Sequence, residues 1–255
     1  MNIRILGCSG GIGAGLRTTA ILVDEDILLD AGTGVGDLTL QEMRAVRHVF
    51  ITHSHLDHIA GLPLLLDTVF EARTGDPVTV HARRETLDAL RAHVFNWVLW
   101  PDFSILPNAA DAVLRFNEIA VDSRLELGGR RVVTADVNHT VPGLAYIVES
   151  EGRAFAFSGD TASNDTLWSA LNALQRLDVL VVETAFGNRN EQLAWQARHY
   201  CPASLADDLH KLRHDPDIWL THLKPGAEQE ILDEVRAFLP HRRLHRLEGG
   251  EVFTL

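Results

Sequence analysis

Short apolar runs separated by polar or glycine-rich segments recur along the whole chain. Runs of this length, rich in β-branched residues and bounded by turn formers, are typical of β-strands. The polar residues Asp24, Glu25 and Asp26 stand between two such runs and predict a hairpin turn. Strands are therefore predicted at residues 3–6, 19–23, 27–29, 48–52, 78–81, 113–116, 131–137, 145–149, 154–158, 179–183, 218–221 and 252–255.

Apolar residues at helical spacing stand between several of these runs. Leu62, Leu65, Leu66 and Phe70 fall on one face of a helix, and Gly75 stands where a C-terminal cap belongs. Helices are predicted at residues 38–46, 62–74, 85–93, 164–174, 201–212 and 227–238.

The two halves of the chain, roughly residues 1–130 and 131–255, both show strands and then helices. This order predicts a single α/β domain over residues 1–255, in which two mixed sheets pack face to face with helices outside. The expected architecture is a four-layer αββα sandwich. Polar residues at successive strand ends then converge on one rim of the sheets.

The composition of the chain argues against a membrane protein, a disulfide-rich protein and a protein that binds a long nucleic acid. The chain has 46% hydrophobic and 23% charged residues, two cysteines, no apolar run long enough for a membrane span and no apolar leader. We therefore expect a cytoplasmic protein without a membrane partner or a disulfide framework. The formal net charge of −12 argues against a long nucleic acid as partner and favours a small substrate.

The densest chemical signal is the segment from His53 to His58, which reads His-Ser-His-Leu-Asp-His after an apolar strand. Imidazole and carboxylate are the usual ligands of zinc and its neighbours. His53 and His55 alternate, so an extended backbone directs both to one side. Asp57 follows where the chain turns and is expected to face a second ion together with His58. The alternative, a solvated histidine-rich loop, does not account for this density.

Three further residues, each just past a predicted strand, complete a ligand set: His139, Asp160 and His222. A single histidine after a strand is more often a surface or packing residue. In the company of the His53–His58 segment, their order favours two metal ions at one site. The simplest assignment gives His139 to the first ion with His53 and His55, gives His222 to the second with Asp57 and His58, and lets Asp160 bridge.

Other motifs are weaker. Residues 7–11 formally match the G-x-S-x-G nucleophile turn of serine hydrolases. In those enzymes a helix must follow, and Gly13 and Gly15 do not suit a helix. We therefore interpret the segment as a turn that lines the rim of the sheets where the predicted metal ligands lie. Asp30 is expected to support the histidine segment from outside the metal. In the aromatic segment 95–103, Trp100 could stack a nucleobase and Asn96 could contact its edge; a hydrophobic cover or a homodimer surface is the alternative.

Taken together, these motifs resemble the metallo-β-lactamase superfamily, and the resemblance covers nearly the whole chain. The leucine at position 56 inside the histidine segment is similar to the class II 3′,5′-cyclic-nucleotide phosphodiesterases. The segments 139–143 (His-Thr-Val-Pro-Gly), 159–161 (Gly-Asp-Thr), 221–225 (Thr-His-Leu-Lys-Pro) and 95–103 (Phe-Asn-Trp-Val-Leu-Trp-Pro-Asp-Phe) are similar to that group as well.

The resemblance implies hydrolysis of a small phosphodiester by a hydroxide that bridges two divalent metal ions, zinc in the first instance, with manganese or iron as alternatives. Asp57 is then expected to bind metal and to orient the nucleophile. His199 falls where the nuclease and phosphodiesterase relatives carry a further histidine, which makes it the expected general acid or phosphate ligand, oriented by Glu183. A surface histidine beside a helix is the alternative for His199.

Two other activities are compatible with the same ligands. One is a nuclease like ribonuclease Z, although no long insertion or basic tract is present. The other is hydrolysis of an ester, lactone or thioester, because the ligand set does not choose the electrophile.

Overall fold

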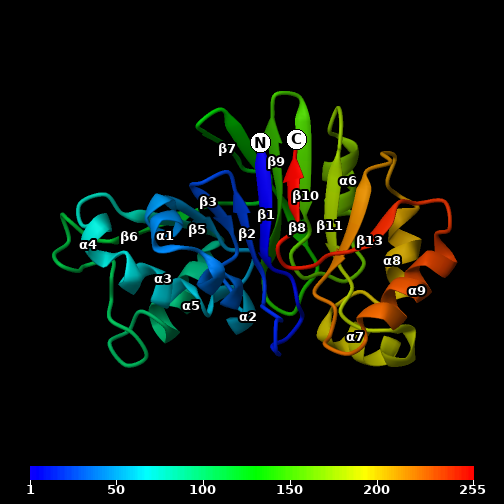
Figure 1. Cartoon of the computed structure of the whole chain (residues 1–255), viewed down its shortest axis with the longest axis horizontal. Helices are drawn as coiled ribbons and strands as arrows, with labels where there is room; N and C mark the ends of the chain where they lie inside the picture. The colour runs from blue at the N-terminus through cyan, green and yellow to red at the C-terminus, as the bar shows by residue number, and fades with distance from the viewer. The chain divides into compact units, whose positions relative to one another are not determined.

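The computed structural model describes residues 1–255. The chain divides into two compact units, each built on one seven-stranded sheet (Figure 1). Unit 1 comprises residues 1–7, 17–120 and 249–254, and unit 2 comprises residues 8–16, 121–248 and 255. The first and last strands of the chain, β1 and β14, both belong to unit 1, where they are neighbouring antiparallel strands.

The sheet of unit 1 has the strand order β14-β1-β2-β3-β4-β5-β6. Pairs from β14 to β3 are antiparallel, and pairs from β3 to β6 are parallel. The strands are β1 (Asn2–Gly7), β2 (Ala20–Val23), β3 (Ile27–Leu29), β4 (His48–Phe50), β5 (Val78–Ala82), β6 (Leu114–Glu118) and β14 (Val252–Thr254).

Helices of unit 1 occupy the connections between its parallel strands. They are η1 (Thr33–Asp37), α1 (Leu40–Ala45), α2 (Leu56–Ile59), α3 (Leu62–Thr68), α4 (Phe70–Arg73) and α5 (Arg84–His93). α1 begins where Thr39 and Glu42 form a reciprocal capping box, which satisfies backbone N–H groups at the helix start. The core of this unit packs Leu28, Val49 and Val80 of the sheet against Leu65 and Leu90 of the helices.

The sheet of unit 2 has the order β13-β12-β11-β10-β9-β8-β7. It repeats the plan of the first sheet, since pairs from β7 to β10 are antiparallel and pairs from β10 to β13 are parallel. The strands are β7 (Arg124–Leu127), β8 (Arg130–Val137), β9 (Gly143–Ser150), β10 (Arg153–Phe157), β11 (Val179–Glu183), β12 (Asp217–Thr221) and β13 (Leu244–Arg246).

The helices of unit 2 are α6 (Thr166–Asn172), η2 (Asn188–Asn190), α7 (Glu191–Ala197), α8 (Pro202–Leu209) and α9 (Glu228–Phe238). Their apolar side chains form a second core with one face of the sheet, in which Trp168, Leu205 and Ile231 are buried. None of the helices in either unit is long and apolar enough to cross a membrane.

The predicted strands and helices are present, with a few differences. The helix predicted from residue 62 is interrupted at Val69, and α3 and α4 lie on either side. The sequence pattern does not predict the strands β7 and β13, the helices α2 and α7, or the short 3₁₀ segments η1 and η2. β7 is a polar edge strand and β13 has three residues, so neither shows an extended apolar run. α7 buries only Ala194 and therefore has no apolar stripe.

Candidate metal centre

The predicted ligands divide between the two units. His53, His55, Asp57 and His58 belong to unit 1 and follow β4; His139, Asp160 and His222 belong to unit 2 and follow β8, β10 and β12. In unit 1 the four residues come from one segment after a single strand. In unit 2, β8, β10 and β12 run in the same direction with β9 and β11 between them, so their carboxyl ends lie at one edge of the sheet.

The first group in unit 1 is the pair His53 and His55, whose Nε2 and Nδ1 atoms lie 3.0 Å apart. Thr52 Oγ1 donates to the Asp30 carboxylate at 2.9 Å, so it accepts a hydrogen bond from His53 Nδ1 at 3.0 Å. His53 Nε2 therefore carries a lone pair, and this lone pair faces His55. Either His55 donates a proton to it, or both nitrogens coordinate one cation.

His58 is held by a buried carboxylate. Its Nδ1 donates to Asp30 Oδ2 at 2.6 Å, and both side chains are fully buried. The same carboxylate accepts from the backbone N–H of Thr52 at 2.7 Å. Burial raises the pKa of Asp30, although His58 and Thr52 act in the opposite direction. Asp57 Oδ2 lies 3.8 Å from His58 Nε2, so these two ligand atoms are directed to one place.

In unit 2, His139 has a defined tautomer. Its Nδ1 donates to the carbonyl oxygen of Arg198 at 2.9 Å, so the lone pair of this imidazole is on Nε2. Arg198 Nη1 returns a hydrogen bond to the carbonyl oxygen of His139 at 2.8 Å. Such support of a histidine through its second ring nitrogen is the usual arrangement around metals.

Asp160 lies next to both other ligands of unit 2. Its carboxylate is within 4.8 Å of the ring nitrogens of His139 and of His222, and Oδ1 is 3.3 Å from His222 Nδ1. All three side chains are buried, with 2–4% of their surface exposed. A buried carboxylate between two imidazoles is suited to bridging two cations.

A buried carboxylate also orients His199. His199 Nδ1 donates to Glu183 Oε1 at 2.7 Å, and Glu183 is fully buried. Burial raises the pKa of Glu183. Burial alone lowers the pKa of His199, but the carboxylates of Glu183 and Asp160 outweigh it, so that this pKa is raised. His199 Nε2 remains for a ligand, and the imidazole stacks on His222 with ring centroids 5.3 Å apart.

The donor sets in both units fit divalent transition metals. Imidazole nitrogens lie 3.0 to 3.8 Å from another imidazole nitrogen or from a carboxylate oxygen. Three of the imidazoles are fixed through their second nitrogen, by Asp30, by the Arg198 carbonyl oxygen and by Thr52. Groups of this kind suit zinc, manganese or iron, and they do not distinguish among these ions.

The aromatic segment of unit 1 has a local structural role. Asn96 Oδ1 accepts from the backbone N–H groups of Val98 and Leu99, and Asn96 Nδ2 donates to the carbonyl oxygen of Ala92. The amide of Asn96 is therefore engaged in the turn after α5 and is not available for a nucleobase without breaking it. Trp100 is half-buried and packs against the core of unit 1.

The sequence of the chain matches a known protein family over most of its length. A family model described as "Beta-lactamase superfamily domain" matches residues 25–239, which is most of the chain. The chain belongs to the metallo-β-lactamase superfamily.

Relatives within this superfamily carry two kinds of name. A probable 3′,5′-cyclic-nucleotide phosphodiesterase of Yersinia pestis is 26% identical over 212 residues, which cover 73% of this chain but only 59% of that protein. A ribonuclease Z of Clostridium beijerinckii is 26% identical over 249 residues, covering 91% of this chain and 78% of that protein. The crystal structure of unliganded yeast PDE1 superposes with a TM-score of 0.82 at 20% identity, over 100% of this chain and 99% of that one.

These matches confirm the predicted α/β metallo-β-lactamase fold with two mixed sheets and the prediction of a metallo-β-lactamase hydrolase. The roles of individual residues stay predictions. Two contributions were missed in the sequence: the support of His139 by Arg198, and the support of His222 by residues 8–11. Arg198 adopts a left-handed conformation with φ 53°, which no local motif indicates.

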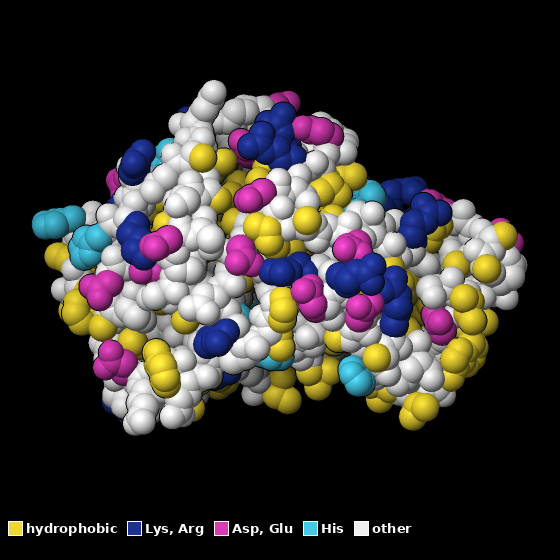
Figure 2. Space-filling model, turned by 180° about the vertical axis from the view of Figure 1, so that it is seen from behind, with side chains coloured by type: hydrophobic (Ala, Val, Ile, Leu, Met, Phe, Trp, Pro, Cys, Tyr) yellow, Lys and Arg dark blue, Asp and Glu magenta, His cyan; other side chains and the backbone are white.

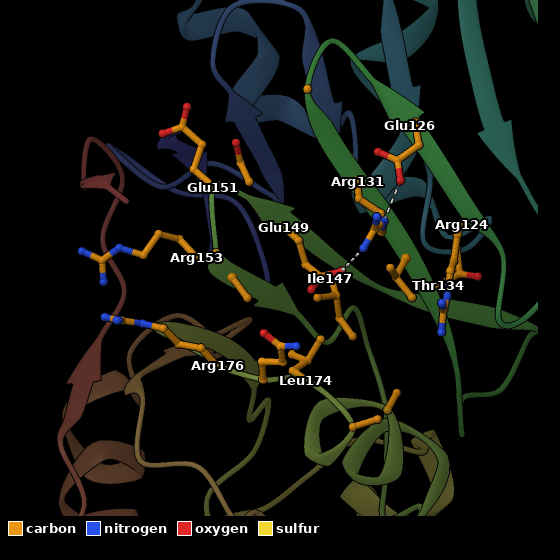
Figure 3. Close-up of a pocket in the computed structure, with 18 of the residues that line it drawn as sticks. Arg124, Glu126, Arg131, Thr134, Ile147, Glu149, Glu151, Arg153, Leu174 and Arg176 are labelled. Atoms are coloured by element: carbon orange, nitrogen blue, oxygen red, sulfur yellow. Dashed lines mark hydrogen bonds and ion pairs between the residues drawn. The ribbon is translucent and has the colours of Figure 1, made fainter.

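A cavity of about 730 Å³ in unit 2 lies away from the predicted ligands, none of which lines it (Figure 3). β7 to β10 and the end of α6 line the cavity. Arg131 spans its wall, with ion pairs to Glu126 at 2.6 Å and to Glu149 at 3.8 Å. The charged lining is balanced: Arg124, Arg131, Arg153 and Arg176 face Asp122, Glu126, Glu149 and Glu151.

Proposed function

We propose that the chain is a dinuclear metal-dependent phosphodiesterase that hydrolyses a small phosphodiester, a 3′,5′-cyclic nucleotide in the first instance. The observation that carries the proposal is the His199–Glu183 pair at 2.7 Å, beside the carboxylate of Asp160. A proton donor with a raised pKa next to metal ligands suits the departure of an alkoxide from phosphorus.

We propose that ligands of both units serve one centre with two divalent ions. His53, His55 and His139 would hold one ion through ring nitrogens. Asp57, His58 and His222 would hold the other, and Asp160 would contribute to both. Bound there, the two ions would lower the pKa of a water and offset the charge on phosphoryl oxygens.

Two side chains of the protein have proposed roles in the reaction, Asp57 on the attacking water and His199 on the leaving group. Asp57, whose side chain is about one-third exposed, orients the attacking water through a hydrogen bond. As the new O–P bond forms, the bond from phosphorus to the ester oxygen breaks. His199 Nε2 donates its proton to that leaving oxygen, and Glu183 stabilises the imidazolium before the proton leaves. Hydrolysis of a cyclic nucleotide in this way gives the nucleoside monophosphate.

A small substrate is favoured over RNA by the distribution of charge. On the face shown in Figure 2, acidic side chains lie beside the basic ones. The cavity of unit 2 has equal numbers of arginines and carboxylates, and the formal net charge is −12. Proteins that hold RNA through its phosphates usually present a net positive surface.

The ribonuclease Z relatives support a second candidate function, hydrolysis of an RNA phosphodiester by the same centre. The chemistry at phosphorus is shared by the two, so that only the substrate distinguishes them. The role of Trp100 as a stacking residue stays a prediction, and so does a homodimer formed through the segment 95–103.

One assay panel tests the proposal. Protein reconstituted with zinc, and in parallel with manganese, is given cyclic AMP, cyclic GMP, bis(p-nitrophenyl) phosphate, precursor tRNA, a lactone and a thioester. We expect turnover of bis(p-nitrophenyl) phosphate and of at least one cyclic nucleotide. Cleavage of precursor tRNA alone would assign the second function, and turnover of the lactone or thioester alone would overturn the phosphodiester proposal.

A further inference from the structure

The glycine-rich segment after β1 belongs to unit 2, although the strand before it belongs to unit 1. Its contacts run to the end of β12. Ser9 forms a parallel β-bridge with Leu223, and Gly10 donates its backbone N–H to the carbonyl oxygen of Leu223 at 3.0 Å. Lys224 Nζ donates to the carbonyl oxygen of Gly10 at 2.7 Å. Residues 8–11 therefore extend unit 2's sheet beyond the end of β12 as a short strap.

The residue that this strap encloses is His222, whose backbone is strained. His222 has φ 60°, a left-handed conformation that a residue with a side chain adopts at a cost of about 1–2 kcal/mol. Its backbone N–H donates to the carbonyl oxygen of Cys8 at 2.8 Å, and Thr221 Oγ1 donates to the same oxygen at 3.1 Å. Such a conformation persists only where surrounding contacts hold it.

Gly10 is in contact with the backbone of this histidine. A Cβ at position 10 would lie 2.3 Å from the carbonyl oxygen of His222 and 3.2 Å from its ring atom Cδ2. The first distance is far below van der Waals contact, and the neighbour is backbone, which cannot swing away. Any side chain at position 10 must therefore displace His222 or separate the strap from β12.

We infer that residues 8–11 are the positioning element for His222, and that the missing side chain of Gly10 sets where this imidazole points. Gly10 touches no substrate in the proposed mechanism, and its effect passes through the His222 backbone. The inference rests on the proposed function, because it assumes that His222 is a ligand of one of the two ions. It goes beyond that function by assigning the glycine-rich segment, which the chemistry at phosphorus does not use.

The test is a titration of metal-free protein with Co²⁺, followed by the visible absorption of bound cobalt, which reports ligand geometry without any substrate. Wild-type protein is expected to bind two ions in two steps. Gly10→Ala should weaken one step by roughly 10- to 100-fold and change its spectrum, as displacement of a metal ligand does, while the other step stays within about threefold. Gly36→Ala is the matched control, because a Cβ there meets no atom within 4 Å, and both steps should be unchanged.

A gentler variant covers the case in which Gly10→Ala does not fold, as judged by circular dichroism and thermal melting. Thr221→Val removes only the Oγ1 bond to Cys8, and it should weaken the same step by a few-fold, about the value of one hydrogen bond. Two wild-type steps that are unchanged in both folded variants, or weakened equally in Gly10→Ala, would overturn the inference. A wild-type protein that binds no cobalt would instead refute the proposed metal centre.

Discussion

The two units have the same sheet topology but use it differently. In both, three antiparallel pairs are followed by three parallel pairs, so β3, β4 and β5 of unit 1 correspond in order to β10, β11 and β12 of unit 2. After β3 stands Asp30, which supports a histidine; after β10 stands Asp160, a proposed ligand. After β4 stand the proposed ligands from His53 on. At the end of β11 stands Glu183, which supports His199.

In unit 1 the supporting carboxylate follows the first of the two corresponding strands and the proposed ligands follow the second. In unit 2 this order is reversed. In each unit one buried carboxylate accepts a hydrogen bond from an imidazole Nδ1, at 2.6 Å in unit 1 and 2.7 Å in unit 2. The two oriented imidazoles have different proposed roles, since His58 binds metal whereas His199 donates a proton. A buried carboxylate at a strand end can therefore orient either a metal-binding imidazole or a proton-donating one, depending on which strand carries the carboxylate.

Asp160→Ala is expected to have the largest effect, because this carboxylate is proposed to serve both ions. Turnover of bis(p-nitrophenyl) phosphate should fall by at least about 10⁴-fold, equivalent to a loss of several kcal/mol of transition-state stabilisation. Metal analysis should show both ions bound more weakly. A variant that keeps two tightly bound ions and wild-type turnover would remove Asp160 from the centre.

Glu183→Gln should separate proton donation from metal binding. The amide keeps the shape of the side chain but loses the charge that favours protonated His199, so we expect kcat to fall by about 10³-fold with little change in KM. Metal content should stay at the wild-type value. Loss of metal from this variant would show that Glu183 supports the ligands rather than His199.

Asp30→Asn, the corresponding change in unit 1, should act on metal instead. His58 loses a charged acceptor, and removal of such a partner usually weakens metal binding by roughly 10- to 100-fold. Turnover at saturating zinc should recover most of its value. If added zinc does not restore turnover, the contrast between the two carboxylates is wrong.

The sequence was informative in unit 1 for a physical reason. Three imidazoles and a carboxylate within the segment 53–58 can be recognised without knowing the fold. In unit 2 the proposed ligands His139, Asp160 and His222 come together only through the order of β8, β10 and β12, so family resemblance and strand-end positions had to identify them.

Contacts that depend on backbone conformation were not predictable. The left-handed residue Arg198 directs its carbonyl oxygen to His139, and the left-handed His222 is enclosed by a segment more than 200 positions away in sequence. Asn96 was predicted to face substrate, but its amide is used within its own turn. Residue type alone does not reveal which local bonds a side chain makes.

The smallest expected effect concerns a feature found in the sheet of unit 1, the buried His81. Burial lowers the pKa of His81 to about 4, with a further contribution from His48, and Asn117 Nδ2 donates to its Nδ1 at 2.8 Å. The unfolded chain binds a proton near pH 6.5 and the folded one does not, so stability falls as the pH decreases from about 6.5 to 4.

His81→Gln should therefore reduce the pH dependence of folding stability. Between pH 7.5 and 4.5 the wild-type protein should lose roughly 2–3 kcal/mol more than the variant, measured by urea unfolding at each pH. The variant itself is expected to be less stable at pH 7.5, since His81 stacks on Phe50 with ring centroids 4.3 Å apart. Parallel pH profiles of the two proteins would show that His81 titrates normally.

The most direct test of the shared two-ion centre is a crystal structure of the zinc-loaded protein with anomalous scattering recorded at the zinc absorption edge. We expect two peaks in each chain, one about 2.0–2.1 Å from ring nitrogens of His53, His55 and His139, the other bound by Asp57, His58 and His222. Peaks bound by the residues of only one unit, or a single peak without Asp160 as a ligand, would contradict the proposed centre.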